Sequence, residues 1–159
     1  QSAWFSPDRK WLLTRILKSS SESDGQLALF DATRGTRRFS FAWKENRGAG
    51  FSSSGEVFWV ATPAQLPEKG SKISFYEVRS GQKLWDCLQR SDAPPLFSPR
   101  DEVFMVGAAG LERRLVRGGR LVQNISGPVS SLCHLALSPD ASQIWSSHDD
   151  GQIWSWRVR

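Results

Sequence analysis

The sequence predicts an all-β protein in which a unit of four short strands recurs along the chain. Three observations indicate this fold: a short phrase repeats, apolar residues fall at matching places after it, and turn residues separate short apolar runs. The phrase reads FSPDRKWLLT at its first occurrence and returns as FSSSGEVFWV, FSPRDEVFMV and LSPDASQIWS. We call the first residue of each phrase its anchor, and the anchors are Phe5, Phe51, Phe97 and Leu137.

The residues that follow each anchor test whether the repeat is real. The positions seven and eight residues past the anchors are all large and apolar: Leu12 and Leu13, Phe58 and Trp59, Phe104 and Met105, Ile144 and Trp145. The anchors lie about 40–50 residues apart, which is the period of arrays and propellers. We therefore expect Trp59 and Trp145 to occupy equivalent buried positions in different units.

The first two strands of each unit are justified by the turn between them and by the apolar run after it. The first strand ends at the anchor, and a tight turn follows that contains Pro7, Pro99 or Pro139, or Ser53-Ser54-Gly55 in the second unit. The next run is continuously apolar, as in WLLT, VFWVA, VFMVG and IWSS. Such a run predicts a strand that is covered on both faces.

Gly-containing turns separate the third and fourth strands of each unit. The third strands are predicted at residues 26–31, 72–78 and 152–158, with a weaker signal at 111–117. The fourth strands are predicted at residues 36–41, 82–88 and 120–125. No segment has the 3.6-residue period of a helix, so helical repeats are excluded.

Radial packing of the four-strand units explains the two-sided second strands better than a sandwich does. An immunoglobulin-like sandwich uses similar strands, but they do not recur as a four-strand unit. In a β-propeller each four-stranded antiparallel blade buries both faces against its neighbours. We expect one domain over residues 1–159, with units at about 1–46, 47–92, 93–132 and 133–159. About three and a half to four blades form an incomplete ring, so closure is expected to need the remainder of the propeller or a second chain.

Three segments resemble the WD-repeat β-propeller family: FSPDRKWLLT, SDGQLALFDATRG (23–35) and LSPDASQIWSSHDDGQIWSWRV (137–158). The resemblance implies that Asp24, Asp150 and Trp156 belong to the buried hydrogen-bond network that braces a blade in this family. The Trp-Asp pair itself is replaced by Phe30-Asp31, Tyr76-Glu77 and Trp156-Arg157, and the family's Gly-His dipeptide is absent. We therefore expect this network to be incomplete and the blades to depend more on apolar packing for their stability. Propellers found beside peptidase and periplasmic transport domains share the Ser-Pro-Asp-Gly turn and are a second choice.

Composition describes a folded globular protein, with 39% hydrophobic and 23% charged residues. No apolar run approaches the roughly 20 residues of a membrane-spanning helix, and QSAWFSPD has no signal-peptide pattern. The net charge of +5 includes two clusters of arginines, Arg34, Arg37 and Arg38, and Arg113, Arg114, Arg117 and Arg120. Acidic residues are interleaved with them, so a solvated surface is expected. Cys87 and Cys133 are expected to be small buried residues of a reducing, cytoplasmic compartment, although spacing alone leaves a disulfide open.

The residues of catalytic or metal chemistry do not form a recognisable constellation. His134 falls in a predicted strand, where a structural role is expected, and His148 precedes the turn Asp149-Asp150-Gly151, where a solvated side chain is expected. No GxSxG or HExxH motif occurs, and GAAGLERR lacks the lysine of a phosphate loop. Paired metal-ligand spacing is absent. We expect no catalytic residue, cofactor or metal, and therefore no enzyme.

The function we expect is a scaffold that binds protein partners. The alternatives are a nucleic-acid-binding propeller, which is less favoured, and an accessory propeller of a larger enzyme; no membrane partner is expected. Long connections at residues 16–25 and 62–71 indicate a binding face, because binding residues concentrate on loops carried by rigid scaffolds. In WD-repeat proteins these loops share a face with the connections between blades, here residues 42–50 and 89–95. The candidate partner-binding residues are Glu22, Trp43, Arg47, Lys69 and Arg90.

Overall fold

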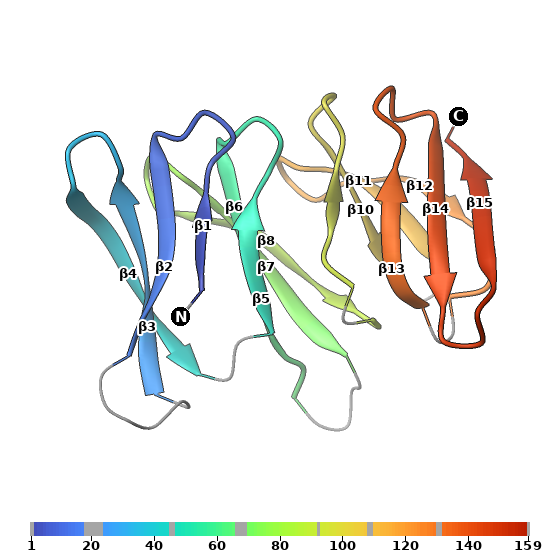
Figure 1. Ribbon diagram of the computed structural model, residues 1–159, viewed down its shortest axis with the longest axis horizontal. Helices are drawn as coiled ribbons and strands as arrows, with labels where there is room; N and C mark the ends of the chain where they lie inside the picture. The colour runs from blue at the N-terminus through green and yellow to red at the C-terminus, as the bar shows by residue number, and fades with distance from the viewer. Residues whose placement is uncertain are drawn as a thin grey trace. The chain divides into compact units, whose positions relative to one another are not determined.

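The chain forms antiparallel β-sheets, as the sequence predicts. The computed structural model describes residues 2–17, 24–44, 47–65, 70–91, 93–107, 110–129 and 132–158. All regular elements in these ranges are strands (Figure 1). Within these ranges, no helix is long and apolar enough to cross a membrane.

The strands form four sheets, and within each sheet they are neighbours in chain order. The first sheet holds β1 (Ala3–Phe5), β2 (Trp11–Leu17), β3 (Asp24–Asp31) and β4 (Thr36–Lys44). The second holds β5 (Gly48–Phe51), β6 (Val57–Pro63), β7 (Ser71–Glu77) and β8 (Lys83–Gln89). The third holds β9 (Leu96–Phe97), β10 (Glu102–Val106), β11 (Leu111–Leu115) and β12 (Leu121–Ile125). The fourth has three strands, β13 (Leu132–Leu137), β14 (Gln143–His148) and β15 (Ile153–Arg157).

The first strand of every sheet ends at its predicted anchor, which confirms the repeat. Trp43 is a correction, because the sequence placed it in the connection after the first unit and the structure places it in β4. The reason is that β3 begins at Asp24 and pairs with β4 as far as Lys44. The paired strands therefore extend beyond the apolar residues from which the strand was predicted.

The chain divides into two compact units. Gln1–Pro63 and Ile73–Trp85 form the first, and Ala64–Lys72 and Asp86–Arg159 form the second. Each unit has a hydrophobic core between two sheets. To describe these cores, we call the side of a sheet that carries the anchor its anchor face, and the side that carries the residue before the anchor its pre-anchor face.

In the first unit, the pre-anchor face of the first sheet packs on the anchor face of the second. Leu13 pairs with Trp4 on the first sheet, and Phe58 pairs with the anchor Phe51 on the second. All four residues belong to one cluster, in which Leu13 and Phe58 are fully buried. The ring of Phe41, from β4, lies 5.5 Å from that of Phe58 in a tilted arrangement, which is favourable for aromatic pairs.

The second unit repeats this arrangement with other residues. Phe104 pairs with Leu96, the residue before the anchor of the third sheet, and Ile144 pairs with Leu137, the anchor of the fourth. These four residues lie in one cluster, in which Phe104 and Ile144 are fully buried. The same pair of faces therefore forms the core of both units.

The third sheet differs from the sequence-based alignment by one residue. Its anchor Phe97 pairs with Val103, whereas Phe51 pairs with Phe58 and Leu137 with Ile144. A shift of one residue exchanges the faces of a strand. Phe104 is therefore the equivalent of Leu13, Trp59 and Trp145, and Met105 lies on the opposite face.

A tighter turn causes this shift. In the first sheet the backbone N–H of Ser6 donates to the carbonyl of Trp11, five residues on. In the third, the N–H of Ser98 donates to the carbonyl of Glu102, only four residues on. The carboxylate of Glu102 also accepts a bond from the Ser98 hydroxyl and pairs with Arg113 at 2.5 Å.

A serine directly after the anchor organises the turn in the first, second and fourth blades. The hydroxyl oxygens of Ser6, Ser52 and Ser138 accept bonds from the backbone N–H five residues later, at 3.0, 3.2 and 2.9 Å. In two turns the same hydroxyl donates to an aspartate, from Ser6 to Asp8 and from Ser138 to Asp140, each at 2.6 Å. The backbone is therefore fixed before the second strand begins.

The residue four positions after each anchor has a left-handed backbone in all four turns. The φ angles are 58° at Arg9, 73° at Gly55, 61° at Asp101 and 58° at Ala141. Only the second turn has the glycine that this conformation favours. For other residues the left-handed region costs roughly 1–2 kcal/mol, so these turns are strained.

Replacing Arg9 with glycine should therefore stabilise the protein. The gain in unfolding free energy should be about 0.5–1 kcal/mol, since relief of strain exceeds the entropy that glycine adds to the unfolded chain. Lys10, the next residue, has no positive φ, so Lys10→Gly is the matched control and should destabilise. Urea denaturation measures both. Equal losses for the two variants would contradict the strain at Arg9.

Stability should fall in acid because of Asp140. Hydrogen bonds from Ser138, and then from Ser142, lower the pKa of this carboxyl from 3.8 to about 2. A carboxyl with a lowered folded-state pKa stabilises the protein above the unfolded pKa, and this contribution is lost as pH falls through the folded pKa. The stability difference between the wild type and Asp140→Asn should therefore be constant above about pH 5 and should shrink between about pH 4 and pH 2. Denaturation curves across this range measure it, and a difference independent of pH would refute this role for Asp140.

Candidate functional site

The predicted binding face lies where β2, β3, β4 and β5 of the first unit meet their connections. The pairs Leu17 with Gly25 and Gly25 with Trp43 bring the ends of β2, β3 and β4 to one edge of the first sheet. Arg47 directly precedes β5, where its backbone N–H donates to the carbonyl of Ala61 at 3.0 Å while its side chain is exposed. Glu22 and Lys69 lie outside the described residues.

Arg90 belongs to the second unit, where it follows β8. Its backbone N–H donates to the carbonyl of Val106 at 3.0 Å, and its side chain is exposed. The preceding residue, Gln89, is 1% exposed, and its amide nitrogen donates to the carbonyls of Ser91 and Ala93. A buried side chain therefore holds Ser91 and Ala93 next to the end of β8, while Arg90 itself faces solvent.

The first sheet has a second end, which carries its β1–β2 and β3–β4 turns. We call it the turn end, and it is basic. Five exposed cations lie in its two turns and at the start of β4: Arg9, Lys10, Arg34, Arg37 and Arg38. Two carboxylates lie among them, Asp8 at 3.4 Å from Lys10 and Asp31 at 4.0 Å from Arg34. Among the described residues, no carboxylate lies within 4.0 Å of Arg9, Arg37 or Arg38, so positive charge exceeds negative charge here.

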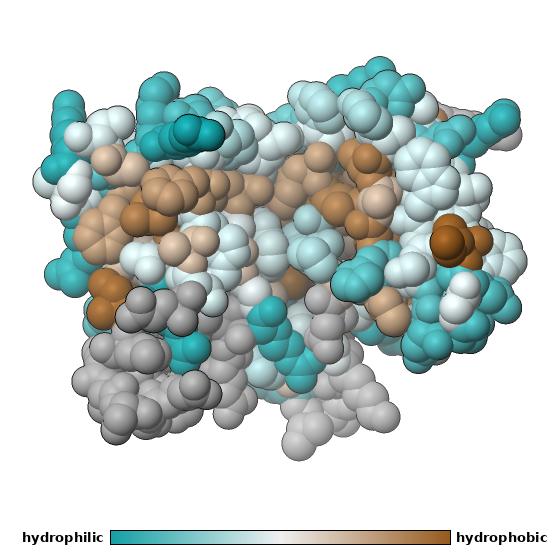
Figure 2. Space-filling model, in the orientation of Figure 1, coloured by the Kyte–Doolittle hydropathy of each residue, from teal (hydrophilic) through white to brown (hydrophobic). Residues whose placement is uncertain are grey.

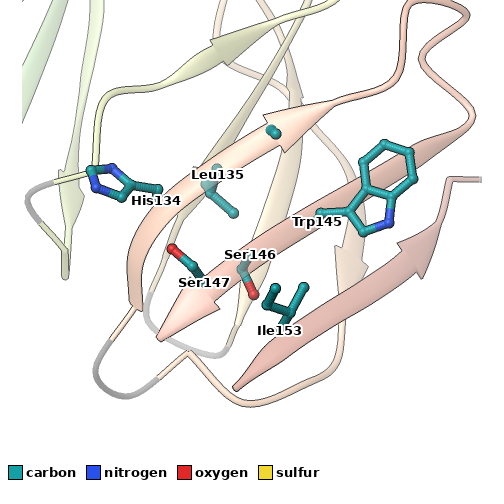
Figure 3. A pocket seen from close by; sticks show the side chains of 7 residues that line it. His134, Leu135, Trp145, Ser146, Ser147 and Ile153 are labelled. Carbon is teal, nitrogen blue, oxygen red and sulfur yellow. The ribbon is translucent and has the colours of Figure 1, made fainter. Parts of the chain in front are cut away.

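The fourth sheet carries a shallow hollow of about 210 Å³ on its surface. Residues of all three strands line it: His134, Leu135, Ala136, Trp145, Ser146, Ser147 and Ile153 (Figure 3). Trp145 and Ile153 are 37% and 75% exposed. The expected equivalence of Trp145 with Trp59 is right in register and wrong in burial, since Trp59 is only 7% exposed.

His148 is buried, whereas the sequence predicted a solvated turn residue. It is the last residue of β14, is 7% exposed, and its Nε2 lies 2.7 Å from the hydroxyl of Ser146 on the same strand. Residues two apart on a strand point to the same face, which explains the contact. The pair has the spacing of a nucleophile and a base. Both side chains are buried in the sheet, and we assign them a structural role.

The residues that the family resemblance singled out make separate contacts. The indole N–H of Trp156 donates to the carbonyl of Ser126, in the connection between β12 and β13, at 3.2 Å. Asp150 accepts a bond from the backbone N–H of Gln152 at 3.0 Å, within the β14–β15 turn. The side chain of Asp24 lies outside what the structure describes.

The two cysteines differ in environment, and neither is in a disulfide. The thiol of Cys87 lies 3.4 Å from the sulfur of Met105, and burial raises its pKa to about 12. Cys133 is exposed on β13, contrary to the expectation of burial. Among the described residues, no group of three or more His, Cys, Asp or Glu side chains is arranged to hold a metal ion.

Comparison with known proteins shows the fold. No family model and no curated protein matches the chain. The structure of the Dos1 propeller matches 99% of this chain with a TM-score of 0.70 at 15% identity. Hydrazine synthase from Kuenenia stuttgartiensis matches 98% with a TM-score of 0.61 at 16% identity. The chain spans 41% of the first protein's length and 58% of the second's. The four sheets are therefore blades of a partial β-propeller.

Trp59 and Trp145 should contribute unequally to stability. Trp59→Ala should cost about 3–5 kcal/mol, as for other buried aromatic residues, and Trp145→Ala much less in dilute solution. Gly50→Ala is a useful third variant, because a Cβ there would come within 2.9 Å of the Trp59 indole and should also destabilise. Urea denaturation measures all three. Equal losses at the two tryptophans would show that the fourth blade is covered like the second.

Proposed function

We propose that the chain is part of a WD-repeat-like propeller of the cytoplasm that binds protein partners and has no catalytic activity of its own. The support is the unequal length of the connections between the second and third strands of the blades. In the first two blades this connection comprises residues 18–23 and 64–70. In the third and fourth blades it is shorter, at residues 107–110 and 149–152. Blade packing does not need the extra length, and binding residues concentrate on such loops.

Arg47 of the first unit and Arg90 of the second are the proposed binding residues that can be tested from described geometry. Each has a backbone N–H bonded to a neighbouring strand and an exposed side chain. A guanidinium held at a fixed backbone position suits carboxylates of a protein partner, which it binds through two parallel hydrogen bonds. We therefore propose partners with acidic segments for these two positions.

A nucleic-acid-binding propeller is the second candidate, and the basic turn end of the first blade favours it. Arg37 lies on the same line of paired residues as the exposed aromatic Phe5, through Phe30 and Leu12. Cations beside aromatic rings are the groups that bind single-stranded nucleic acid. Mutations at the turn end of the first blade and mutations of Arg47 and Arg90 can therefore distinguish the two candidates.

A third candidate is the accessory propeller of a larger enzyme. One of the similar structures is named for an enzyme, hydrazine synthase, and this chain spans 58% of that protein's length. In that case the catalytic residues belong to another part of the polypeptide.

Reversing the charge of Arg47 and Arg90 should distinguish protein binding from nucleic-acid binding. In Arg47→Glu with Arg90→Glu, the amount of partner protein captured from a nuclease-treated lysate should fall roughly tenfold. Unfolding free energy should stay within about 0.5 kcal/mol, because both side chains are on the surface. Quantitative mass spectrometry of the captured proteins measures the loss.

Arg37→Glu with Arg38→Glu is the matched control at the turn end of the first blade. It should leave protein capture unchanged. Two results together would favour the nucleic-acid candidate over the scaffold. The wild type would bind a single-stranded oligonucleotide in a salt-sensitive way that this control abolishes, and it would capture no protein after nuclease treatment.

A further inference from the structure

The turns that join the third and fourth strands of the first two blades carry an excess of positive charge. Both turns lie within the first compact unit. Figure 2 shows hydrophilic side chains at the upper edge of the view, over the β3–β4 turn. The five exposed cations of the two turns form what we call the basic turn surface: Arg34, Arg37, Arg38, Arg79 and Lys83.

The two turns are neighbours and have the same backbone geometry. A Cβ added at Gly81, in the β7–β8 turn, would come within 2.9 Å of the ring of Phe39 on β4. Gly35 and Gly81 follow their anchors by the same number of residues, and their φ angles are 66° and 69°. By the same alignment, Arg37 and Lys83 are equivalent positions of the two blades. The surface therefore presents cations at matching places on neighbouring blades.

Two carboxylates lie in these turns, and both hold groups of their own turn. Asp31 accepts bonds from the backbone N–H and the hydroxyl of Thr33, at 3.0 and 2.6 Å. Glu77 accepts a bond from the hydroxyl of Ser80 at 2.5 Å. Both carboxylates are therefore engaged in turn structure.

Three of the five cations have no carboxylate near them. Among the described residues, none lies within 4.0 Å of Arg37, Arg38 or Arg79. All three of these side chains are exposed. Because five cations face only two carboxylates, the surface attracts anions.

Packing of a further blade does not cover these turns. The anchor face of the second blade is covered within the first unit, where Tyr76 of that blade packs on the core. Lys83 is nevertheless exposed at the end of the same blade. Arg37 is the equivalent residue of the first blade, so its exposure does not depend on which segment precedes β1.

The basic turn surface has no apolar anchor of the kind that protein interfaces use. Charged residues are depleted at the centre of such interfaces, where aromatic side chains carry much of the binding energy. Among the described residues, no exposed large hydrophobic side chain lies in β3, β4, β7, β8 or the turns that join them. Arginine binds phosphate through paired hydrogen bonds, and phosphate contacts supply essentially all of sequence-independent nucleic-acid binding.

We propose that the basic turn surface binds the phosphate backbone of a nucleic acid without reading its sequence. Its cations recur from one blade to the next, as phosphates recur along a strand. This activity goes beyond the proposed protein binding, which uses Arg47 and Arg90, and the chain can have both. It also differs from the second candidate function, because it spans two blades and needs no aromatic side chain.

Fluorescence anisotropy with a labelled DNA duplex of mixed sequence tests the proposal on the 159-residue chain. Arg38→Glu with Arg79→Glu reverses one cation on each blade, and duplex affinity should fall roughly tenfold or more. The slope of log K against log salt should become shallower by about 2, since each lost phosphate contact lowers it by about 1. Arg38→Lys with Arg79→Lys keeps both charges and should retain most of the affinity. Circular dichroism should show that all variants fold, as expected for exposed positions.

Arg47→Glu with Arg90→Glu is the matched control, because it changes the net charge equally at residues outside these turns. It should bind the duplex like the wild type. Absence of duplex binding by the wild type would overturn the proposal, as would an equal loss in the control, because binding would then follow net charge. Preference for polyglutamate or for vesicles containing phosphatidylserine over the duplex would also overturn it. Duplex binding by a chain that captures no protein would support this proposal and refute the protein scaffold.

Discussion

Apolar packing of one sheet on the next is the interaction on which the rest of this structure depends. A propeller blade cannot bury its own faces, so its stability comes from its neighbours. Leu13, Phe58, Phe104 and Ile144 are fully buried at these contacts. Burial of such a side chain contributes about 1.5–3 kcal/mol. Asp150 and Trp156, which the family resemblance assigned to one side-chain network, each bond to a backbone group. The faces between sheets provide the cores of both units.

The turns matter because they decide which side chains reach those faces. In the first, second and fourth blades, the serine after the anchor holds the chain while it reverses, and the next strand starts in a fixed register. In the third blade a turn one residue tighter exchanges the two faces, and Phe104 rather than Met105 joins the core of the second unit. The strand remains apolar at both positions, so it tolerates the shift. A strand with strict alternation of apolar and polar residues would not.

The chain separates two kinds of surface. The broad sides of the blades are apolar and suit contacts with further blades, while the charged residues lie mainly at the strand ends. Positive charge gathers at the turn end of the first blade, and Arg47 and Arg90 are exposed next to connections between blades. The residues that pack one blade on the next are therefore different from the charged residues at the strand ends.

The sequence by itself determined the repeat, the all-β class and the end of the first strand in every blade, because turn residues and short apolar runs act locally. It placed Arg47 and Arg90 in connections between blades, and the structure shows that both side chains are exposed. Only the tertiary structure decided which large residues are buried. Trp59 and Trp145 share a register but differ in exposure, His148 is buried in a turn-like sequence, and Cys133 is exposed in an apolar strand. The physical reason is that burial depends on the sheet that covers a face, and that sheet comes from a distant part of the chain.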